Sequence, residues 1–383
     1  MNDLRTLFSL FILNCHSKQP RIGFFLATLN GGGAEKVTLN LAKALTENNY
    51  YVELIVANTN GPLLKEVPAS IPLIDLKAKR VSRSLFRLAS HLKSSTISTL
   101  FSVLPHASIV AITASLLCRS NIRIIVSEHN TLSKSLANAK TFRGQFLHLP
   151  MKFAYRSADT VLAVSNGVAD DISTVLGLPR SRIRVIYNPV IGPNFEKLKT
   201  EKIDHPWLAS KVTPVVIAVG RLTKAKDFPT LLKAFSIVRE KQPVRLIILG
   251  EGSDRAALEQ LRSELNLEDD VSMPGFISNP IPLISKADVF VLSSIWEGLP
   301  TVLIEALACA TPIVSTDCRS GPREILCNGR YGALVPVGDS VALARKIDSY
   351  LIQPPIAIAQ TAWDSFSYKA VIHQYQALIQ EKV

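Results

Sequence analysis

The stretch ADVFVLSSIWEGLPTVLIEALACATP (287–312) joins a short apolar run to a longer one through a polar loop. The first run (287–294) predicts a buried strand, and the second predicts a helix with Pro300 at its first position, where a missing N–H costs nothing. The N–H groups of Thr301 and Val302 then have no partner inside the helix. A strand, a loop and a free helix N-terminus together form a receptor for phosphate.

Two glutamates lie on either side of this phosphate receptor. Glu297 is in the loop. Glu305 is inside the helix among apolar neighbours, so we expect its carboxylate to lie at the rim of a buried site, where it needs a partner. Glu297 and Glu305 are eight positions apart, and a helix of that length spans about 12 Å. The two carboxyl groups of a glycosidase stand only about 5 to 9.5 Å apart. The spacing therefore favours two contacts on one long ligand, such as a nucleotide-sugar, over an acid–base pair.

Length and composition limit the class of protein. A chain of 383 residues with 47% hydrophobic content predicts two globular domains. No apolar run reaches the roughly 18 residues that span a bilayer, and LFSLFIL (7–13) lacks the flanks of a signal peptide, so we interpret it as a frayed extension or a weak membrane-contact helix. The five cysteines form no C-x-x-C pair, which indicates free thiols in a reducing cytoplasm.

The positive charge is confined to the first half of the chain. Residues 1–190 carry 22 Lys and Arg against 10 Asp and Glu, whereas residues 191–383 carry 21 of each, so the whole net charge of +12 lies in the first half. A basic half favours an anionic partner, which is a membrane surface, a phosphorylated acceptor or nucleic acid. A generally basic, soluble surface is the alternative.

Continuous apolar strands alternate with amphipathic helices along the chain, which predicts doubly wound α/β domains. The predicted strands are RIGFFLATL (21–29), YVELIVAN (51–58), IRIIVSE (122–128), DTVLAVS (159–165), PVVIAVG (214–220), RLIILG (245–250), DVFVLSS (288–294) and TPIVSTD (311–317).

Glycine-rich and basic turns follow several of these strands, at the edge where such folds bind ligands. The turn 30–35 contains Gly32 and Gly33, which allow close approach of a ligand or simply make a tight turn. Gly250 opens a similar turn, which either borders a base or ribose or only caps a helix. In GRLTKAKD (220–227), Arg221 and Lys226 are suited to clamp a diphosphate opposite the free helix N-terminus.

His129, in SEHNT (127–131), ends another predicted strand, where it has either a catalytic or a structural role. With GGGAEKV, VSNGVADD, YNPV, AVGRLTKAKD, LIILGEG, MPGF, the E-x7-E segment, SGPREIL and YGALVPVGD, the chain resembles the family-4 retaining glycosyltransferases of the GT-B fold, of the bacterial surface-glycan type. The resemblance covers nearly the whole chain. It implies two Rossmann-like domains that face a central cleft.

The resemblance also implies a role for each candidate site residue. Arg221 and Lys226 bind the donor diphosphate, Glu297 binds the donor sugar, and His129 lies near that sugar. These four are the predicted catalytic residues. The predicted donor-binding residues are Gly32, Gly33, Arg221, Lys226, Gly250, Glu297, Thr301, Val302 and Glu305, with Glu305 on the ribose hydroxyls.

One residue departs from the family pattern. Many members have glycine at the position of Pro300, and proline has no N–H to donate, so the phosphate amides must be those of Thr301 and Val302. The resemblance implies transfer without a metal and with retention of the anomeric configuration. We expect no cofactor, since the nucleotide-sugar counts as a substrate. No side chain is an evident nucleophile. We therefore expect front-face attack, with catalysis by positioning and electrostatic stabilisation of the leaving phosphate.

We expect residues 1–190 to bind the acceptor, 191–212 to be a linker, 213–360 to bind the nucleotide-sugar, and 361–383 to form a helix that packs back towards the first domain. UDP is the expected nucleotide, with GDP as an alternative. The expected acceptor is a glycan or a polyprenyl-diphosphate-linked sugar of lipopolysaccharide or exopolysaccharide biosynthesis. The expected location is cytoplasmic and peripheral, on the inner face of the cell membrane.

The membrane prediction depends on a basic amphipathic stretch in which Arg80, Arg83 and Arg87 recur at helical spacing, supported by four further cations of the first half: Lys134, Lys140, Arg143 and Lys152. An ordinary surface helix is the alternative. Two rival functions stay open, which are a GT-B epimerase or phosphorylase and, more distantly, a non-enzymatic nucleic-acid-binding protein. No nucleic-acid-binding motif supports the latter, and we expect no nucleic-acid partner.

Overall fold

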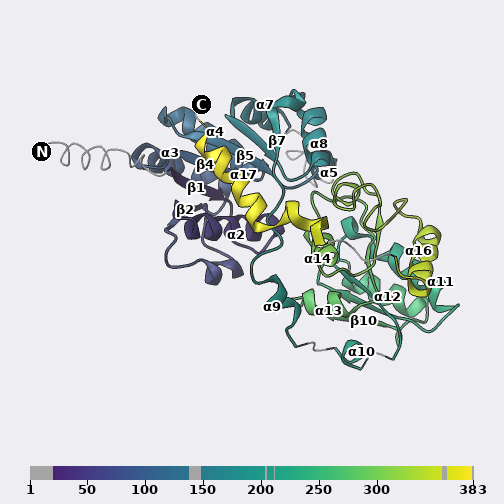
Figure 1. Cartoon of the computed structure of the whole chain (residues 1–383). Coiled ribbons are helices and arrows are strands. Elements are labelled where there is room, and N and C mark those ends of the chain that lie inside the picture. The colour runs from purple at the N-terminus through teal and green to yellow at the C-terminus, as the bar shows by residue number, and fades with distance from the viewer. Residues whose placement is uncertain (1–19, 138–147, 203–204, 211, 356–359, 382–383) are drawn as a thin grey trace, which may run out of the picture. The chain divides into compact units, whose positions relative to one another are not determined.

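The computed structural model of the chain describes residues 20–137, 148–202, 205–210, 212–355 and 360–381 (Figure 1). The run 7–13 and the cations Lys140 and Arg143 lie outside the described residues. The described residues form two compact units. Unit 1 contains residues 20–128, 148–162 and 372–381, and unit 2 contains residues 129–137 and the described part of 163–371.

The first sheet has seven strands in the order β3-β2-β1-β4-β5-β6-β7. β1 pairs in parallel with β2 and with β4, and β4 pairs in parallel with β5. β1 and β5 are buried along nearly their whole length, as expected of strands covered on both faces. The strands are β1 Arg21–Leu26, β2 Tyr51–Val56, β3 Leu73–Asp75, β4 Thr99–Val103, β5 Arg123–Glu128, β6 Thr160–Ala163 and β7 Ile183–Val185.

Two of the helices between these strands begin with recognisable caps. Glu35 closes a capping box on the first of them, and Ser165 accepts a hydrogen bond from Val168 N at 3.2 Å at the start of another. The α-helices are α2 Gly33–Glu47, α3 Leu85–Ser94, α4 Pro105–Cys118, α5 Leu132–Ala137, α7 His148–Ser157 and α8 Asn166–Leu176, and the 3-10 helices are η1 Pro62–Glu66, η2 Val81–Ser84 and η3 Arg180–Arg182.

The second sheet has six strands in the order β10-β9-β8-β11-β12-β13, with parallel ladders throughout. The strands are β8 Val215–Val219, β9 Arg245–Leu249, β10 Val271–Gly275, β11 Val289–Leu292, β12 Ile313–Thr316 and β13 Ala333–Val335.

The helices that follow are α9 Phe195–Lys199, α10 Pro206–Ala209, α11 Phe228–Arg239, α12 Arg255–Glu264, α13 Ile281–Lys286, α14 Thr301–Ala308, α15 Pro322–Ile325, α16 Ser340–Ile352 and α17 Tyr368–Gln380, with 3-10 helices η4 Lys224–Lys226 and η5 Gln360–Phe366. One face of the second sheet packs on α11 and α16, which lie side by side in Figure 1. Phe235 and Ile248 are fully buried in this core.

Within unit 1, the second half of α17 packs on the first sheet. Tyr375 is buried with its ring centroid 5.7 Å from that of Phe101, and an Arg123 Nη1–H donates to Leu378 O at 2.6 Å. The first turn of α17 belongs to unit 2. The domain boundaries expected from the sequence remain predictions, because the strands of the first sheet extend to Val185 while residues 129–137 and 163–185 group with unit 2.

Two details differ from the sequence-based expectations, and a third agrees with them. Pro300 is the N-cap of α14, in an extended conformation, so the helix begins one residue later, at Thr301. Arg80, Arg83 and Arg87 do not share one continuous α-helix, because Arg80 precedes η2, Arg83 lies in it and Arg87 lies in α3. Among the helices in the described part of the chain, none is long and apolar enough to cross a bilayer.

Candidate functional site

The strand order of the second sheet places its topological switch point between β8 and β11. Chain connections leave these two neighbouring strands in opposite directions, which is the point at which doubly wound sheets bind ligands. The loops that follow the two strands touch. Ile295 N donates to Ala225 O at 2.8 Å, and Ser293 Oγ donates to Lys226 O at 2.7 Å. The basic loop and the E-x7-E loop are therefore held together at the carboxyl edge of the sheet.

Lys226 and Glu297 form an ion pair at this edge. Lys226 Nζ lies 2.6 Å from Glu297 Oε1, and Ser294 Oγ donates to the same oxygen at 2.5 Å. The two side chains are 18% and 11% exposed, so solvent screens the pair only weakly. A Cβ on Gly220 would lie 3.2 Å from Lys226 Cε, so glycine leaves room for the lysine to lie across the loop. The pair holds a cation where a phosphate can recruit it.

The N-terminus of α14 opens beside this ion pair. Pro300 is the cap, so Thr301 and Val302 are the first two helical residues, and their N–H groups precede the first intrahelical bonds. Pro300 packs closely on Gly321, where a Cβ would lie 2.3 Å from Pro300 Cδ. This contact fixes the entry of the chain into α14. The predicted phosphate amides are thus at the helix end that favours anions.

Glu305 follows Thr301 by one turn of α14 and shares its face of the helix. Side chains in a helix lean towards its N-terminus, so the carboxylate of Glu305 is directed to the same end as the free amides. Glu305 is half-buried, whereas Arg221, at the start of the loop after β8, is exposed. The two residues offer an acceptor for hydroxyls and a donor for anions.

Gly250 has a structural reason to be glycine. Its φ is +139°, and a Cβ there would lie 2.0 Å from Gly220 O, so the loops after β8 and β9 are in backbone contact. The predicted contact of Gly250 with the donor remains a prediction.

His129 also belongs to unit 2 and lies against the E-x7-E loop. A Cβ on Gly298 would lie 2.1 Å from His129 O, so the two backbones touch. Burial lowers the pKa of the His129 imidazole from 6.5 to about 4. The ring is therefore neutral near pH 7 and is suited to hydrogen bonding rather than to charge.

Gly32 and Gly33 are in unit 1, where they begin α2. Gly32 N donates to Glu35 Oε2 at 2.8 Å, while Thr28 Oγ1 donates to Glu35 Oε1 at 2.7 Å. A Cβ on Gly33 would meet nothing within 4 Å, so the space before this residue is open. Glu35, which holds the loop in shape, was not predicted as a site residue, although its position three residues after the cap is the signal of a capping box.

Seven of the predicted site residues thus occur together around the loops of β8, β9 and β11: Arg221, Lys226, Gly250, Glu297, Thr301, Val302 and Glu305. Three hydroxyl residues of the same unit were missed: Thr131, Ser165 and Ser294. Thr131 and Ser165 contact the loop from more than 130 positions away in the chain, and no local pattern reports such a contact. Among the described residues, no three His, Cys, Asp or Glu side chains gather as a metal-binding group.

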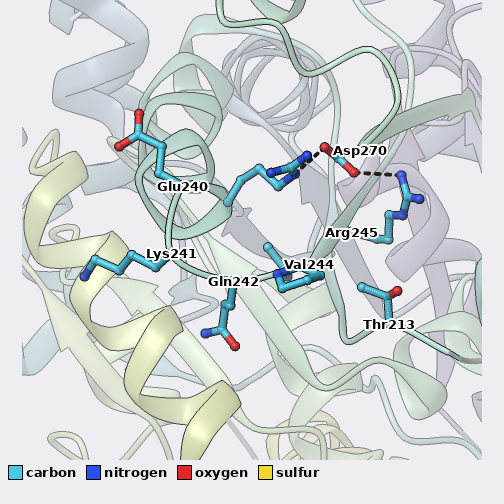
Figure 2. Close-up of a pocket in the computed structure, with 9 residues that line it drawn as sticks. Thr213, Glu240, Lys241, Gln242, Val244, Arg245 and Asp270 are labelled. Carbon is cyan, nitrogen blue, oxygen red and sulfur yellow. Dashed lines mark hydrogen bonds and ion pairs between the residues drawn. The ribbon is translucent and has the colours of Figure 1, made fainter.

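A second hollow lies at the opposite edge of this sheet, at the amino end of β9 (Figure 2). It encloses about 350 Å³, and Asp270 there pairs with Arg239 and with Arg245, whose Nη1 lies 2.7 Å away. Its two arginines share one carboxylate, and none of the predicted site residues lines this hollow. We therefore place the functional site at the carboxyl edge of the sheet.

Two family descriptions together match most of the chain. Glycosyltransferase Family 4 matches residues 31–191, and Glycosyl transferases group 1 matches residues 199–369. An N-acetylgalactosaminyltransferase that acts on diphospho-undecaprenol-linked sugars in Campylobacter jejuni is 28% identical over 353 residues, which is 86% of this chain and 90% of the relative. The lipopolysaccharide core biosynthesis glycosyltransferase LpsE of Rhizobium meliloti is 31% identical over 61% of this chain and 68% of its own length.

Solved structures give the same fold. Anabaena HepE in complex with UDP and glucose matches with a TM-score of 0.78 at 21% identity, over 94% of this chain and 99% of HepE. The lipopolysaccharide outer core galactosyltransferase WaaB matches with a TM-score of 0.72 at 21% identity, over 94% and 99%. The two parallel sheets and these solved structures show the GT-B fold, and the family descriptions show that the chain is a glycosyltransferase.

Within that class, the chain belongs to the family-4, or group 1, glycosyltransferases. The predicted family, the α/β GT-B fold and the predicted enzyme class are therefore confirmed.

Proposed function

We propose that this enzyme moves a sugar from a UDP-sugar to a lipid-linked glycan of a bacterial surface polysaccharide, without a metal and with retention of anomeric configuration. The observation that carries the donor half of this proposal is the Lys226–Glu297 pair beside the α14 N-terminus, with Glu305 one turn further on. The UDP in the HepE complex and the diphospho-undecaprenol substrate of the Campylobacter relative support the choice of donor and acceptor.

In this proposal each site residue has one task. Lys226, Arg221 and the amides of Thr301 and Val302 bind the diphosphate and stabilise the negative charge that grows on it as the sugar leaves. Glu297 accepts hydrogen bonds from the donor sugar. A carboxylate whose lysine partner is recruited by phosphate is free to make such contacts.

Glu305 accepts hydrogen bonds from the ribose in the same scheme. His129 stays neutral near the sugar, as its lowered pKa requires. Gly33 of unit 1, which has open space in front of it, together with Gly32, allows a close approach of the donor. These assignments follow the family resemblance residue by residue.

The transfer step proceeds by front-face attack. The acceptor oxygen bonds to the anomeric carbon on the face that the diphosphate leaves, the bond between that carbon and the diphosphate oxygen breaks, and the acceptor proton passes to the leaving phosphate oxygen. No protein nucleophile takes part. The enzyme contributes position and electrostatic stabilisation.

Replacing Lys226 by Ala tests the donor half. We expect kcat to fall by about 100-fold or more, as for removal of a group that stabilises the transition state. Lys224→Ala is the matched control, because Lys224 is an exposed lysine in the same basic loop and should leave kcat within about twofold of wild type. Folded K226A protein with wild-type turnover would sink the mechanism.

A GT-B epimerase or phosphorylase is the rival function. Wild-type enzyme incubated with a panel of nucleotide-sugars, with and without lipid-diphosphate acceptors, separates the classes. Release of nucleotide only when an acceptor is present, with a product heavier by one sugar, supports transfer. Release without acceptor, or formation of an isomeric sugar, supports the rival.

The acceptor half of the proposal depends on the surface of unit 1. The unit 1 part of the range 76–158 (residues 76–128 and 148–158) contains 10 Lys and Arg but only one acidic residue, Glu128, which is fully buried and accepts a hydrogen bond from Tyr155 OH at 2.8 Å. The exposed charge over this range is therefore entirely positive. An anionic surface is its natural complement.

Three neighbouring helices present this charge together with large apolar side chains. α4 lies between α3 and α7, as Figure 1 shows. Phe86 at the start of α3 is 77% exposed, and Leu149 and Phe153 on the first turns of α7 are 59% and 58% exposed. Helices that return antiparallel to the strands begin at the carboxyl edge of a parallel sheet, so Phe86 and Leu149, at the starts of their helices, lie towards that edge.

The partner that fits this surface is an anionic lipid bilayer. Aromatic and leucine side chains insert at the headgroup boundary, and each cation near the surface adds about 1 kcal/mol. Arg80 and Arg83 are exposed beside Phe86, whereas Arg87 is partly engaged, because its Nη1 donates to Leu76 O and Lys77 O at 2.7 Å. The first two arginines are therefore the more available charges.

Flotation with vesicles tests the surface. Wild-type enzyme should float with phosphatidylglycerol vesicles at low ionic strength but not with phosphatidylcholine vesicles. The triple variant Arg80→Ser, Arg83→Ser and Phe86→Ser should lower the bound fraction about tenfold, because it removes two interfacial charges and one insertion.

The matched control changes two cations and one exposed apolar residue on α16 of unit 2: Arg345→Ser, Lys346→Ser and Val341→Ser. It should float like wild type. Absence of wild-type binding to anionic vesicles at low salt contradicts the membrane proposal, and tighter binding to random duplex DNA than to vesicles would assign the basic surface to nucleic acid instead.

A further inference from the structure

Two backbone carbonyls of the E-x7-E loop are held by hydroxyl groups from distant parts of unit 2. Thr131 Oγ1 donates to Glu297 O at 2.5 Å, across 166 positions of sequence. Ser165 Oγ donates to Gly298 O at 2.8 Å, across 133 positions. Thr131 is 2% exposed and Ser165 is fully buried, so water does not compete for these bonds.

The loop is also in direct backbone contact with the segment that carries Thr131. A Cβ on Gly298 would overlap His129 O at 2.1 Å. The hydrogen bond from Thr131 and this contact lie two residues apart on the same segment. Glu297 and His129 therefore cannot change their relative positions without breaking both.

The segment 129–133 is itself fixed to α8. Ser133 N and Ser133 Oγ donate to the two carboxylate oxygens of Asp171, at 2.9 and 2.6 Å, and Asp171 is fully buried. An Arg319 Nη1 lies 3.8 Å from the same carboxylate. A buried carboxylate that accepts two hydrogen bonds and faces a guanidinium is a rigid anchor.

The start of α8, where Ser165 lies, is fixed as well. The Ser165 hydroxyl accepts from Val168 N while it donates to Gly298 O, so both of its hydrogen-bonding functions are used. The Glu324 carboxylate accepts from Asn166 N at 3.0 Å and from Tyr187 OH at 2.7 Å. The two hydroxyls thus connect the E-x7-E loop to a fixed frame.

This frame matters because the other partner of the Glu297 side chain is Lys226, the group that a diphosphate would recruit. When Lys226 turns to phosphate, Ser294 and the backbone of the loop are what keep the carboxylate in place. Misplacement of a substrate-binding group by about 1 Å lowers a rate by about 100-fold. Backbone anchors of this kind act in the bound state, when the ion pair has loosened.

We propose that Thr131 and Ser165 are positioning residues for the transfer reaction, which fix the Glu297 carboxylate towards the donor sugar by holding the carbonyls of Glu297 and Gly298. The inference rests on the proposed function, in which Glu297 binds the sugar and other groups bind the nucleotide. It predicts that losing an anchor harms the handling of the sugar and spares the handling of the nucleotide.

Thr131→Val and Thr131→Ser test it as a pair. Valine keeps the shape of threonine but cannot donate, whereas serine keeps the hydroxyl. We expect T131V to lower kcat at least about tenfold and to raise the share of UDP-sugar that is hydrolysed rather than transferred. The Kd for UDP alone should stay within about twofold of wild type, and T131S should recover kcat to within about threefold.

A wild-type kcat in folded T131V overturns the inference, and so does an equal loss in T131V and T131S or a matching loss of UDP affinity, since each indicates a role that is not positioning. If T131V does not fold, Ser165→Ala carries the same expectation for kcat, hydrolysis and UDP binding. Failure of both to fold would assign the hydroxyls to the folding of the unit and also overturns the inference.

The proposed function fails by a different result. If wild-type enzyme transfers no sugar from any nucleotide-sugar, or if K226A keeps full turnover, the donor assignment is wrong. Loss of activity in K226A together with wild-type behaviour of T131V leaves the function standing and removes only the positioning role.

Discussion

His129 carries the clearest pH signature of any single residue in the site. Its pKa in the folded chain is about 4, against 6.5 when exposed, because burial disfavours the charged ring. Between these two pH values the unfolded chain binds a proton that the native chain does not. The stability contribution is therefore complete above pH 6.5 and is lost as the pH falls towards 4, by at most about 3 kcal/mol.

We accordingly expect His129→Asn to lose less stability than wild type between pH 7.5 and pH 5. Urea unfolding at the two pH values measures the loss of unfolding free energy in each protein. The contribution of the carboxylates cancels when the two losses are subtracted, because both proteins contain the same carboxylates. An identical pH dependence in the two proteins would mean that His129 is accessible to protons in the native state. In that case its neutral role near the sugar would lose its basis.

The candidate site residues that sequence reasoning was able to select are those whose signal is local. Neighbours within about ten positions are enough to recognise a glutamate among apolar helix residues, a lysine in a turn after a strand or a glycine before a helix. Thr131 and Ser165 do not, because their significance arises only when chain segments more than 130 positions apart meet. Hydroxyl residues are common in turns, so their presence alone indicates nothing.

At the scale of elements, the apolar runs predicted eight of the thirteen strands in the described residues. They missed β3, β4, β7, β10 and β13, which are only three to five residues long, because so short a run cannot be told from part of a buried helix by its pattern alone. Helix starts were less predictable. Pro300 has ψ near 100°, so it ends the loop instead of starting α14. A proline is compatible both with the cap position and with the first helical position, so the sequence alone does not decide between them. The spacing of Arg80, Arg83 and Arg87 fits a helix, yet the chain makes a 3-10 turn before α3, which redirects the first two.

The contact between the E-x7-E loop and the segment after β5 gives an element-scale prediction. Gly298→Ala places a methyl group 2.1 Å from His129 O, so one of the two segments must move. We expect a loss of about 2 to 3 kcal/mol in unfolding free energy, typical of overpacking. Gly33→Ala is the matched control, since a Cβ there meets nothing within 4 Å.

Urea unfolding of both glycine variants, followed by circular dichroism, distinguishes them. G33A should unfold at the wild-type midpoint or slightly above it, because alanine favours a helix. Equal midpoints for G298A and wild type would show that the two segments yield easily. The close contact would then not constrain the site.

At the scale of the whole molecule, unit 1 takes part of its core from the far end of the sequence. Tyr375 and Leu378 are almost fully buried there, although they follow all of unit 2 in the chain. Tyr375→Ala should destabilise unit 1 by about 3 kcal/mol, whereas Gln374→Ala, an exposed neighbour on the same helix, should be neutral.

Hydrogen exchange, measured for the amides of each strand, tests whether Y375A destabilises unit 1 alone. Amides of β1 and β4, beneath Phe24 and Phe101, should exchange faster in Y375A than in Q374A, while amides of β8 and β11 should be unchanged. Equal acceleration in both sheets would indicate that the two units unfold as one.

The position of α17 also has a consequence for synthesis on the ribosome. Residues 20–128 emerge first, yet the side chains that complete their core emerge only after the roughly 200 residues of unit 2. The later part of the chain is thus able to reach its native state before the earlier part does. A nascent first half with exposed Phe101 is a substrate for chaperones, and an expression fragment that stops at residue 190 would lack its own last layer.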